Sequence, residues 1–356
     1  MLRKLSVIGA LMLAVITTNG QDSTAKAKKE SNFTFSGSVD AYFRADFDKN
    51  VSNNRTSFTN TTGKLALGMA SARVDYAIKK ITLTADLGVG KRAKEFAYND
   101  KGVLATVKQL YASYSPADWI KFTGGTWATH VGYELVDPGG NRNYSMSYMF
   151  SWGPFLHTGA KTDLTFGKST IMVGISNPTD YRDAPSNNKK ALLFQYGYAF
   201  SDNVKIYLNY LGGQRPTDSA KVRQYDVVLT AKLSDKFNVA YNGTLNSSKT
   251  QQKSIYADAS TWGGSAFYFN YDPVKNFGIT LRSEIFNDKN KLAALSSAPF
   301  GSSIFANTIS GNVKLGPVTI VPELRFESAN KAVFFNKDGN GKSNSSSLLV
   351  AAYYKF

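Results

Sequence analysis

The sequence contains no cysteine and only two histidines, His130 and His157. The absence of cysteine excludes disulfide bonds, thiolate metal sites and cysteine nucleophiles. No run of about 18 apolar residues follows position 20, which argues against a transmembrane helix. Acidic residues are also scarce: the sequence has 26 Asp and Glu and 42 Lys and Arg, which gives a formal net charge of +16.

Residues 1–20 have the features of a secretory signal peptide. Arg3 and Lys4 precede an apolar stretch from Leu5 to Ile16, and small or polar residues follow up to Gly20. The alternative, an uncleaved membrane anchor, is disfavoured by the short apolar stretch and the polar residues after it. We expect residues 21–31 to be a flexible basic tail. Export also argues against nucleic acid as a partner, despite the basic charge.

What the sequence has in abundance is alternation of polar and apolar residues. Between residues 33 and 47, one parity is apolar and the other carries Asp40, Arg44 and Asp46. Similar alternation recurs at 70–78, 81–89, 204–210, 225–233, 277–285, 318–326 and 348–356. Since successive side chains of a strand point to opposite faces, each segment is predicted to be a strand with one apolar and one polar face.

The connections between these segments alternate between short turns and long loops. Residues 79–80, 167–168 and 316–317 are short turns, whereas 48–63, 129–153 and 327–346 are long loops. This sorting predicts an all-β fold, a closed antiparallel transmembrane β-barrel of about 16 strands with short periplasmic turns and long extracellular loops. Residues 32–356 would form this single outer-membrane domain, whereas a soluble sandwich gives no reason for such sorting.

Aromatic residues support a barrel that spans the outer membrane. A set of them occurs on the apolar parity next to the short turns: Tyr76, Tyr114, Phe166, Phe200, Phe237, Phe277 and Tyr354. Such a ring is typical of the interfacial girdle of a membrane barrel, and predicts contact with outer-membrane lipid. Phe356 closes the last strand as an aromatic residue, and we expect it to act as the signal that the barrel-assembly machinery reads.

The polar parity must line the interior, because a sheet in lipid has to close and to turn its apolar face outward. About 16 strands enclose more space than their own side chains fill, so a water-filled lumen is expected. The charged candidates for lining or constricting it are Arg44, Arg73, Asp86, Lys121, Glu134, Asp137, Arg142, Lys161, Asp163, Arg282, Glu284 and Arg325. Their signs nearly balance, which favours cross-strand ion pairs with weak selectivity; a basic constriction that prefers anions is the alternative.

The loop 129–153 is the longest and is rich in aromatic residues. Loops of more than about 15 residues usually have a function or are disordered, and the aromatic content argues against disorder. Two arrangements remain open. The loop folds into the lumen and narrows it, or it packs on neighbouring loops outside.

Three stretches resemble a known family: FSGSVDAYFRADF at 35–47, GYELVDPGGNRNYSMSYMF at 132–150 and GPFLHTGAK at 153–161. They are similar to the OmpL-like β-barrel porins, and the resemblance extends over residues 32–356. It implies a signal peptide, a single outer-membrane barrel and a porin-like role. It fixes neither a substrate nor any ligand-binding residue.

The residues offer little support for catalysis. His130 and His157 could meet Ser145, Ser147 or Glu134 near one rim, but a catalytic triad is defined by geometry that the sequence does not supply. The two histidines also lack the helical spacing of many two-histidine metal sites. We therefore expect no enzymatic activity, no cofactor and no metal.

The sequence is best interpreted as a porin of the bacterial outer membrane that lets small hydrophilic solutes or ions diffuse passively through its lumen. The alternative is a non-conducting barrel that serves as a scaffold for surface adhesion or binding through its long loops. A third reading is a saccharide-selective channel with Tyr42, Tyr111, Tyr207 and Tyr353 as stacking surfaces. The sequence leaves the oligomeric state open, including a homo-oligomer.

Overall fold

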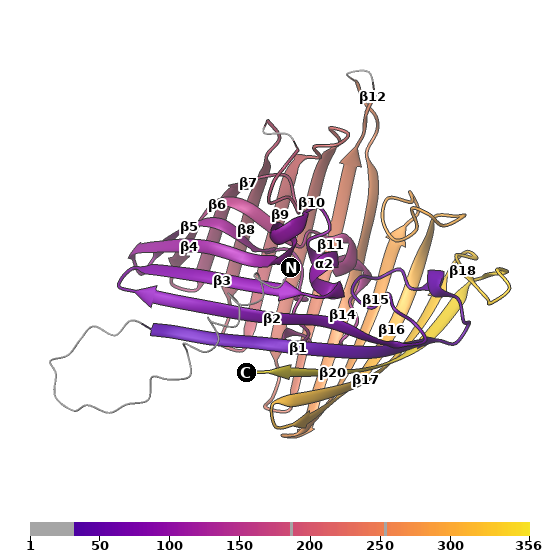
Figure 1. Ribbon diagram of the computed structural model, residues 1–356. Coiled ribbons are helices and arrows are strands. Elements are labelled where there is room, and N and C mark those ends of the chain that lie inside the picture. Colours follow the sequence, from indigo (N-terminus) through magenta and orange to yellow (C-terminus); the bar gives the residue numbers. More distant parts are fainter. Residues whose placement is uncertain (1–31, 186–187, 253–254) are drawn as a thin grey trace, which may run out of the picture. The chain divides into compact units, whose positions relative to one another are not determined.

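The computed structural model describes residues 32–185, 188–252 and 255–356. The signal peptide and the basic tail that the sequence predicts lie outside these residues. Sixteen antiparallel strands close into one barrel, each hydrogen-bonded to its neighbours in chain order (Figure 1). The predicted all-β barrel and its strand number are thereby confirmed.

The first eight barrel strands are β1 (Asn32–Asp46), β2 (Leu65–Ile78), β3 (Ile81–Val89), β4 (Val107–Ala117), β5 (Ile120–Ala128), β6 (Leu156–Phe166), β7 (Ser169–Ser176) and β8 (Ala191–Ala199). The other eight are β9 (Val204–Gln214), β10 (Lys221–Lys232), β11 (Phe237–Lys249), β14 (Ser260–Val274), β15 (Phe277–Asp288), β16 (Ser302–Leu315), β17 (Val318–Ala329) and β20 (Asn344–Lys355). Pairing of β1 with β20, from Ser38 opposite Lys355 to Asp46 opposite Ser347, closes the sheet.

The turns at one end of the barrel are short and the connections at the other end are long, as the sequence predicts. The long connections contain the small elements η1 (Val51–Asn53), α2 (Lys91–Phe96), η2 (Gly102–Thr106), η3 (Pro138–Gly140) and α3 (Tyr148–Trp152). Two of them form small hairpins, β12 (Gln251–Gln252) with β13 (Ile255–Tyr256) and β18 (Phe334–Phe335) with β19 (Gly341–Lys342). Within the described part of the chain, no helix is long and apolar enough to cross a membrane.

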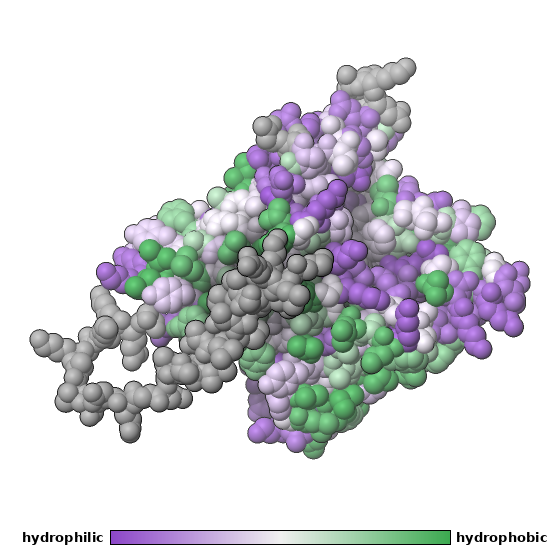
Figure 2. Space-filling view, viewed as in Figure 1, coloured by the Kyte–Doolittle hydropathy of each residue, from purple (hydrophilic) through white to green (hydrophobic). Residues whose placement is uncertain are grey.

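Each strand presents an apolar outer face and a polar inner face. In β10, the outward Tyr225 is 49% exposed, whereas the inward Asp226 next to it is 6% exposed. Hydrophobic residues gather over the visible outer side of the strands near β1, β17 and β20, and hydrophilic residues gather toward the loop ends near β12 and β18 (Figure 2). The outward aromatic residues at the short-turn end include Tyr114, Phe166, Phe200 and Tyr354, all exposed. This distribution matches a sheet whose outer face meets lipid.

A β-bulge in β2 shows how the wall adapts to polar groups inside. Val39 pairs with Ala70 but Ala41 pairs with Leu67, so β2 carries an extra residue near Gly68 and Met69. The carboxylate of Asp40 accepts a hydrogen bond from the backbone N–H of Met69 at 3.0 Å. A Cβ atom at position 68 would lie 1.7 Å from Oδ2 of Asp40, so glycine is required there.

Candidate solute pathway

The connection between β5 and β6, residues 129–155, lies inside the barrel. Its backbone N–H groups donate to inward carboxylates of widely separated strands: Gly132 to Asp226 on β10, Tyr144 to Glu323 on β17, and Tyr148 to Glu284 on β15. Of the two arrangements that the sequence left open, the structure has the one in which this loop crosses the interior. We call residues 129–155 the inner loop.

Local hydrogen bonds give the inner loop a defined shape. Ser147 caps α3, because its Oγ accepts a hydrogen bond from the N–H of Phe150 at 3.1 Å. Oε2 of Glu134 in turn accepts from both the N–H and the Oγ of Ser147, at 2.8 and 2.9 Å. Glu134 therefore connects the start of the inner loop to its helix.

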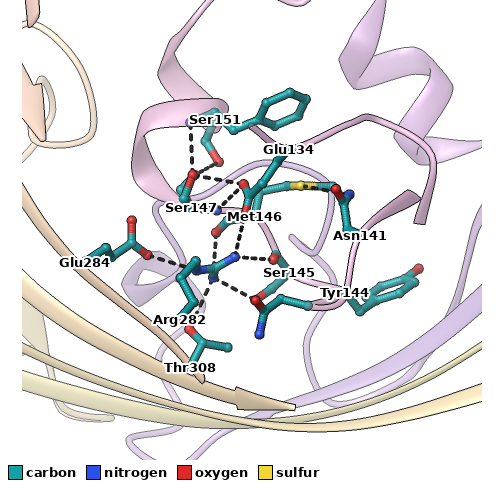
Figure 3. A network of polar contacts seen from close by, with 12 residues as sticks. Glu134, Asn141, Tyr144, Ser145, Met146, Ser147, Ser151, Arg282, Glu284 and Thr308 are labelled. Carbon is teal, nitrogen blue, oxygen red and sulfur yellow. Dashed lines mark hydrogen bonds and ion pairs between the residues drawn. The ribbon is translucent and has the colours of Figure 1, made fainter. Parts of the chain in front are cut away.

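Arg282 of β15 fixes the inner loop to the wall (Figure 3). Its guanidinium donates to Oε1 of Glu134 at 2.7 Å and to the carbonyl oxygen of Ser145 at 2.7 Å. It also donates to the carbonyl oxygen of Met146 at 3.1 Å and to Oγ1 of Thr308 at 3.1 Å. The Arg282 side chain has no exposed surface. A buried charge is costly unless it is paired and hydrogen-bonded; both terminal nitrogens of Arg282 are bonded, and its Nε lies 3.5 Å from Oε1 of Glu284. The loop and the wall therefore depend on each other.

Two more strand charges extend this contact to β17. Arg325 lies 3.1 Å from Oε1 of Glu284 and 3.0 Å from Oε1 of Glu327, and it donates to the carbonyl of Met146 at 3.2 Å. The hydroxyl of Tyr148 donates to Glu327 at 2.6 Å. We call the inward side chains of Arg282, Glu284, Glu323, Arg325 and Glu327 the charged wall. The inner loop covers it, and all five residues are buried.

A second attachment of the inner loop involves β1 and α2. The hydroxyl of Tyr144 donates to the carboxylate of Asp40, and the guanidinium of Arg92 lies 4.7 Å from the centre of the Tyr144 ring. Arg92 also donates to the carbonyl oxygen of Val136 at 3.3 Å. An apolar cluster packs beneath these contacts and joins three long connections: Phe58, Phe96, Val136, Met146, Phe150, Phe155 and Leu156.

Asp180, in the connection between β7 and β8, holds the end of the inner loop. Its Oδ1 accepts from the N–H groups of Phe155 and Leu156 at 2.7 and 2.9 Å, and its Oδ2 accepts from the hydroxyl of Tyr98 at 2.9 Å. Burial raises the pKa of Asp180 to about 6, because the carboxylate loses its hydration there, and these three donors only partly offset that cost.

Open space remains between the inner loop and β8–β11, a part of the barrel that β14 separates from the charged wall. An outer cavity of about 350 Å³ lies at the long-loop end, lined by Tyr98, Trp152, Gln214 and Trp262 among others. An inner cavity of about 240 Å³ lies nearer the short turns, lined by Gln195, Tyr207, Asn209 and Thr230 among others.

A narrow gap of about 10 Å³ lies between the two cavities. It shares Gly153, Pro154 and Gln224 with the outer cavity and Gly132 with the inner cavity, so the three spaces follow one another along the wall. Phe150 of the inner loop and Asn242 of β11 also line it. A volume of this size holds about one water molecule.

Six of the strand side chains that border these spaces are carboxamides. We call the following set the carboxamide wall: Gln195, Asn209, Gln214, Gln224, Asn242 and Asn246. Hydrogen bonds fix several of them across strands. The amide of Asn209 donates to Asp226 at 2.7 Å, that of Asn242 donates to Asp226 at 2.6 Å, and that of Asn246 donates to Gln224 at 3.2 Å.

The sequence prediction concerned charged residues and missed the carboxamide wall. The signal was present, because Asn209, Gln224 and Asn242 occupy the inward parity of three consecutive strands. Of the four tyrosines considered for stacking, Tyr207 lines the inner cavity. Tyr42 and Tyr353 are buried in a cluster with Tyr144, and Tyr111 packs beside Trp127.

The charged candidates fall into three groups. Arg282, Glu284, Arg325 and Glu134 belong to the covered contact between charged wall and inner loop. A second group lies around β2–β6: Arg73 pairs with Asp75, Lys108 bridges Asp86 of β3 and Asp137 of the inner loop, and Lys121 and Lys161 both approach Asp163. Arg44 pairs with Asp46 at 3.5 Å, and Arg142 of the inner loop pairs with Asp272 at the end of β14. None of the twelve lines the outer cavity, the gap or the inner cavity.

The two histidines lie side by side but away from the serines that the sequence offered as partners. Their ring centroids are 5.2 Å apart. His157 contacts Oγ1 of Thr129 and His130 contacts the carbonyl oxygen of Tyr210, whereas Ser147 bonds to Glu134. Among residues 32–185, 188–252 and 255–356, no three His, Cys, Asp or Glu side chains gather as metal ligands would.

Comparison with known proteins places this geometry in a family. The model of the family described as "Putative beta-barrel porin-2, OmpL-like" matches residues 32–356. The chain belongs to this family. The predicted resemblance to OmpL-like porins is thereby confirmed, and the barrel is of the porin type. No curated protein sequence matches the chain.

Solved outer-membrane barrels share the fold of this member of the family at low sequence identity. OmpT of Vibrio cholerae, expressed in the outer membrane, has 10% identity and a TM-score of 0.59, over 94% of this chain and 100% of that one. The anion-selective porin from Comamonas acidovorans has 10% identity and a TM-score of 0.62, over 92% of this chain and 100% of that one. At this identity, the likeness concerns the fold.

Proposed function

We propose that this protein is a passive diffusion channel of the bacterial outer membrane, in which small hydrophilic solutes pass between the inner loop and the carboxamide wall. The observation that carries the proposal is the row formed by the outer cavity, the gap and the inner cavity. It runs from the long-loop end of the barrel toward the short turns, as a route across the membrane must.

Membership in a porin family and the outward apolar face support this proposal. Exposed aromatic residues at the short-turn end, such as Phe166 and Phe200, would contact lipid headgroups. The terminal Phe356 pairs with Gly37 of β1 through two backbone hydrogen bonds of 3.1 Å, where the assembly machinery would engage the closing strand. We propose no cofactor and no catalytic step.

One observation favours a second candidate, the non-conducting scaffold. The gap is wide enough for only about one water molecule, and the inner loop is fixed at both ends. In this alternative the long loops bind a surface ligand and the lumen stays blocked. In the diffusion channel, the residues that narrow the gap, above all Phe150 and Gly153, move enough to admit a solute.

Ion conductance distinguishes the two functions. The purified protein, refolded in detergent and inserted into a planar lipid bilayer, should give discrete current steps in concentrated potassium chloride. A salt gradient across the bilayer then gives ion selectivity from the reversal potential. A barrel that is folded, as judged by its heat-modifiable migration in gels, but that never conducts would support the scaffold and overturn the channel. Cross-linking of the folded protein would show whether it forms a homo-oligomer.

A further inference from the structure

We infer that the pathway selects neutral polyhydroxylated solutes, of the size of a monosaccharide, over ions of similar size. This inference rests on the proposed channel function and concerns the solute class that its wall accepts. The surfaces that border the cavities carry fewer charged side chains than the barrel interior as a whole.

The route contains little charge that is free to attract an ion. The inner cavity has no Asp, Glu, Lys or Arg among its lining residues. In the outer cavity, Arg215 pairs with Asp218 at 3.0 Å, and Asp180 is bound by Tyr98 and two backbone N–H groups. At the gap, both oxygens of Asp226 already accept hydrogen bonds from the amides of Asn209 and Asn242.

Carboxamides suit hydroxyl groups because each presents both donors and acceptors, as a sugar hydroxyl does. Gln224, which borders both the outer cavity and the gap, shows this balance. Its amide donates to Oγ1 of Thr244 at 3.0 Å, and its carbonyl accepts from Asn246 at 3.2 Å. One donor and one acceptor site of the side chain remain for a solute. The cross-strand bonds hold the group in place, so little conformational entropy is lost on contact.

Aromatic rings at the entrance suit the apolar face of a sugar ring. Trp152 is 40% exposed and Tyr98 is 59% exposed, and both line the outer cavity together with Tyr181 and Trp262. Dispersion contacts with such rings favour the flat C–H surface of a pyranose, while the carboxamides bind its hydroxyls. Such a ring offers a small inorganic cation only a cation–π contact, and it offers a small inorganic anion no favourable contact. Rings and carboxamides together indicate a neutral polyhydroxylated solute.

Liposome swelling tests the inference. Proteoliposomes are placed in isotonic glucose, sodium gluconate or glucosamine hydrochloride, three probes with the same carbon skeleton length but charges of zero, minus one and plus one. We expect glucose to enter several times faster than either charged probe. Equal or faster entry of gluconate or glucosamine would overturn the inference, while leaving the channel function intact. Absence of both swelling and conductance would instead overturn the channel function.

A pair of variants locates the selectivity. Gln224→Glu adds a negative charge at the gap, where one charge at about 4 Å in water should speed glucosamine and slow gluconate by about fivefold each. The ratio of their entry rates should therefore rise by about thirtyfold. The matched control is Asn238→Asp, a carboxamide on the inner side of β11 that lines none of the three spaces. In Asn238→Asp, the ratio of the entry rates of glucosamine and gluconate should stay as in the parent protein. An equal shift in both variants would overturn the placement of the route along the carboxamide wall. If Gln224→Glu fails to fold, the ranking of the three probes on the parent protein still decides.

Discussion

The charged wall and the carboxamide wall lie in the same barrel, yet they meet the inner loop in opposite ways. On the charged wall, Arg282 and Glu284 have exposed side-chain fractions of 0 and 1%, because the loop covers them. On the carboxamide wall the loop contacts the strands at a few points, such as the bond from Gly132 to Asp226, and cavities of about 350 and 240 Å³ lie beside these contacts. Buried charges fix the loop because leaving them unpaired is costly, whereas carboxamides border space that a solute can enter. The charged side chains of this interior therefore serve mainly to hold the inner loop in place.

The largest effect is expected from removing the central guanidinium of the charged wall. Arg282→Met leaves Glu134 without its cationic partner in a buried site, which costs about 3–5 kcal/mol. We expect the inner loop to detach and the single-channel current to become larger and noisier. Arg73→Met is the matched control, because Arg73 is an inward arginine that pairs with Asp75 and is one-third exposed. Quiet current steps of parental size from a folded Arg282→Met barrel would show that the loop does not depend on this network.

The second prediction acts on the gap itself. Phe150→Ala removes an aromatic ring that lines the gap, and the current should rise severalfold because the narrowest part of the route widens. Phe58→Ala is the control, since Phe58 packs against Phe150 in the same apolar cluster but lines none of the three spaces. Both substitutions should destabilise the loop region by a similar amount, about 3–5 kcal/mol. If the two variants conduct equally, loosening of the cluster rather than the width of the gap controls the current.

Local sequence patterns determine the strands of this barrel but not the position of its inner loop. Alternation along each strand and the sorting of short and long connections predicted sixteen strands, because both patterns are local. The position of the inner loop depends on contacts such as that between Glu134 and Arg282, which are 148 residues apart. No local pattern specifies which inward charges the loop will cover. The sequence therefore could not separate Arg282, under the loop, from Lys121, which is half exposed.

The third prediction concerns pH, through the group that ends the inner loop. The pKa of Asp180 is about 6 in the folded protein and near its ordinary value of 3.8 when unfolded. Between these values the folded state binds more protons, so this group increases the free energy of unfolding as the pH falls from 7 to 4, by about 2 kcal/mol. The gain is lost again as the pH rises through 6. Asp180→Asn should remove it, since an amide does not titrate.

Urea unfolding, followed by tryptophan fluorescence, gives the free energies of unfolding of the parent and of Asp180→Asn at pH 7 and at pH 4. The effect is the change, between the two pH values, in the difference between these free energies. Asp183→Asn is the control, because it removes an exposed carboxylate from the same connection between β7 and β8. If the free energies of unfolding of the parent and of Asp180→Asn differ by the same amount at both pH values, Asp180 is not protonated in the folded protein. The channel current of Asp180→Asn at neutral pH should match the parent, since an amide can keep the bonds to Phe155 and Leu156.

The smallest effect is expected on the side of the barrel where charge is exposed but borders none of the three spaces. The side chain of Lys121 on β5 is 49% exposed and lies 3.8 Å from Asp163. Exposed pairs of this kind contribute at most about 1 kcal/mol, and screening by salt weakens them further. Lys121→Gln should therefore leave the barrel stable and the reversal potential in a salt gradient almost unchanged, whereas Gln224→Glu should move that potential toward cation selectivity. A larger shift from Lys121→Gln than from Gln224→Glu would place the route of ions along β3–β6, and the carboxamide wall would then have to be explained as packing alone.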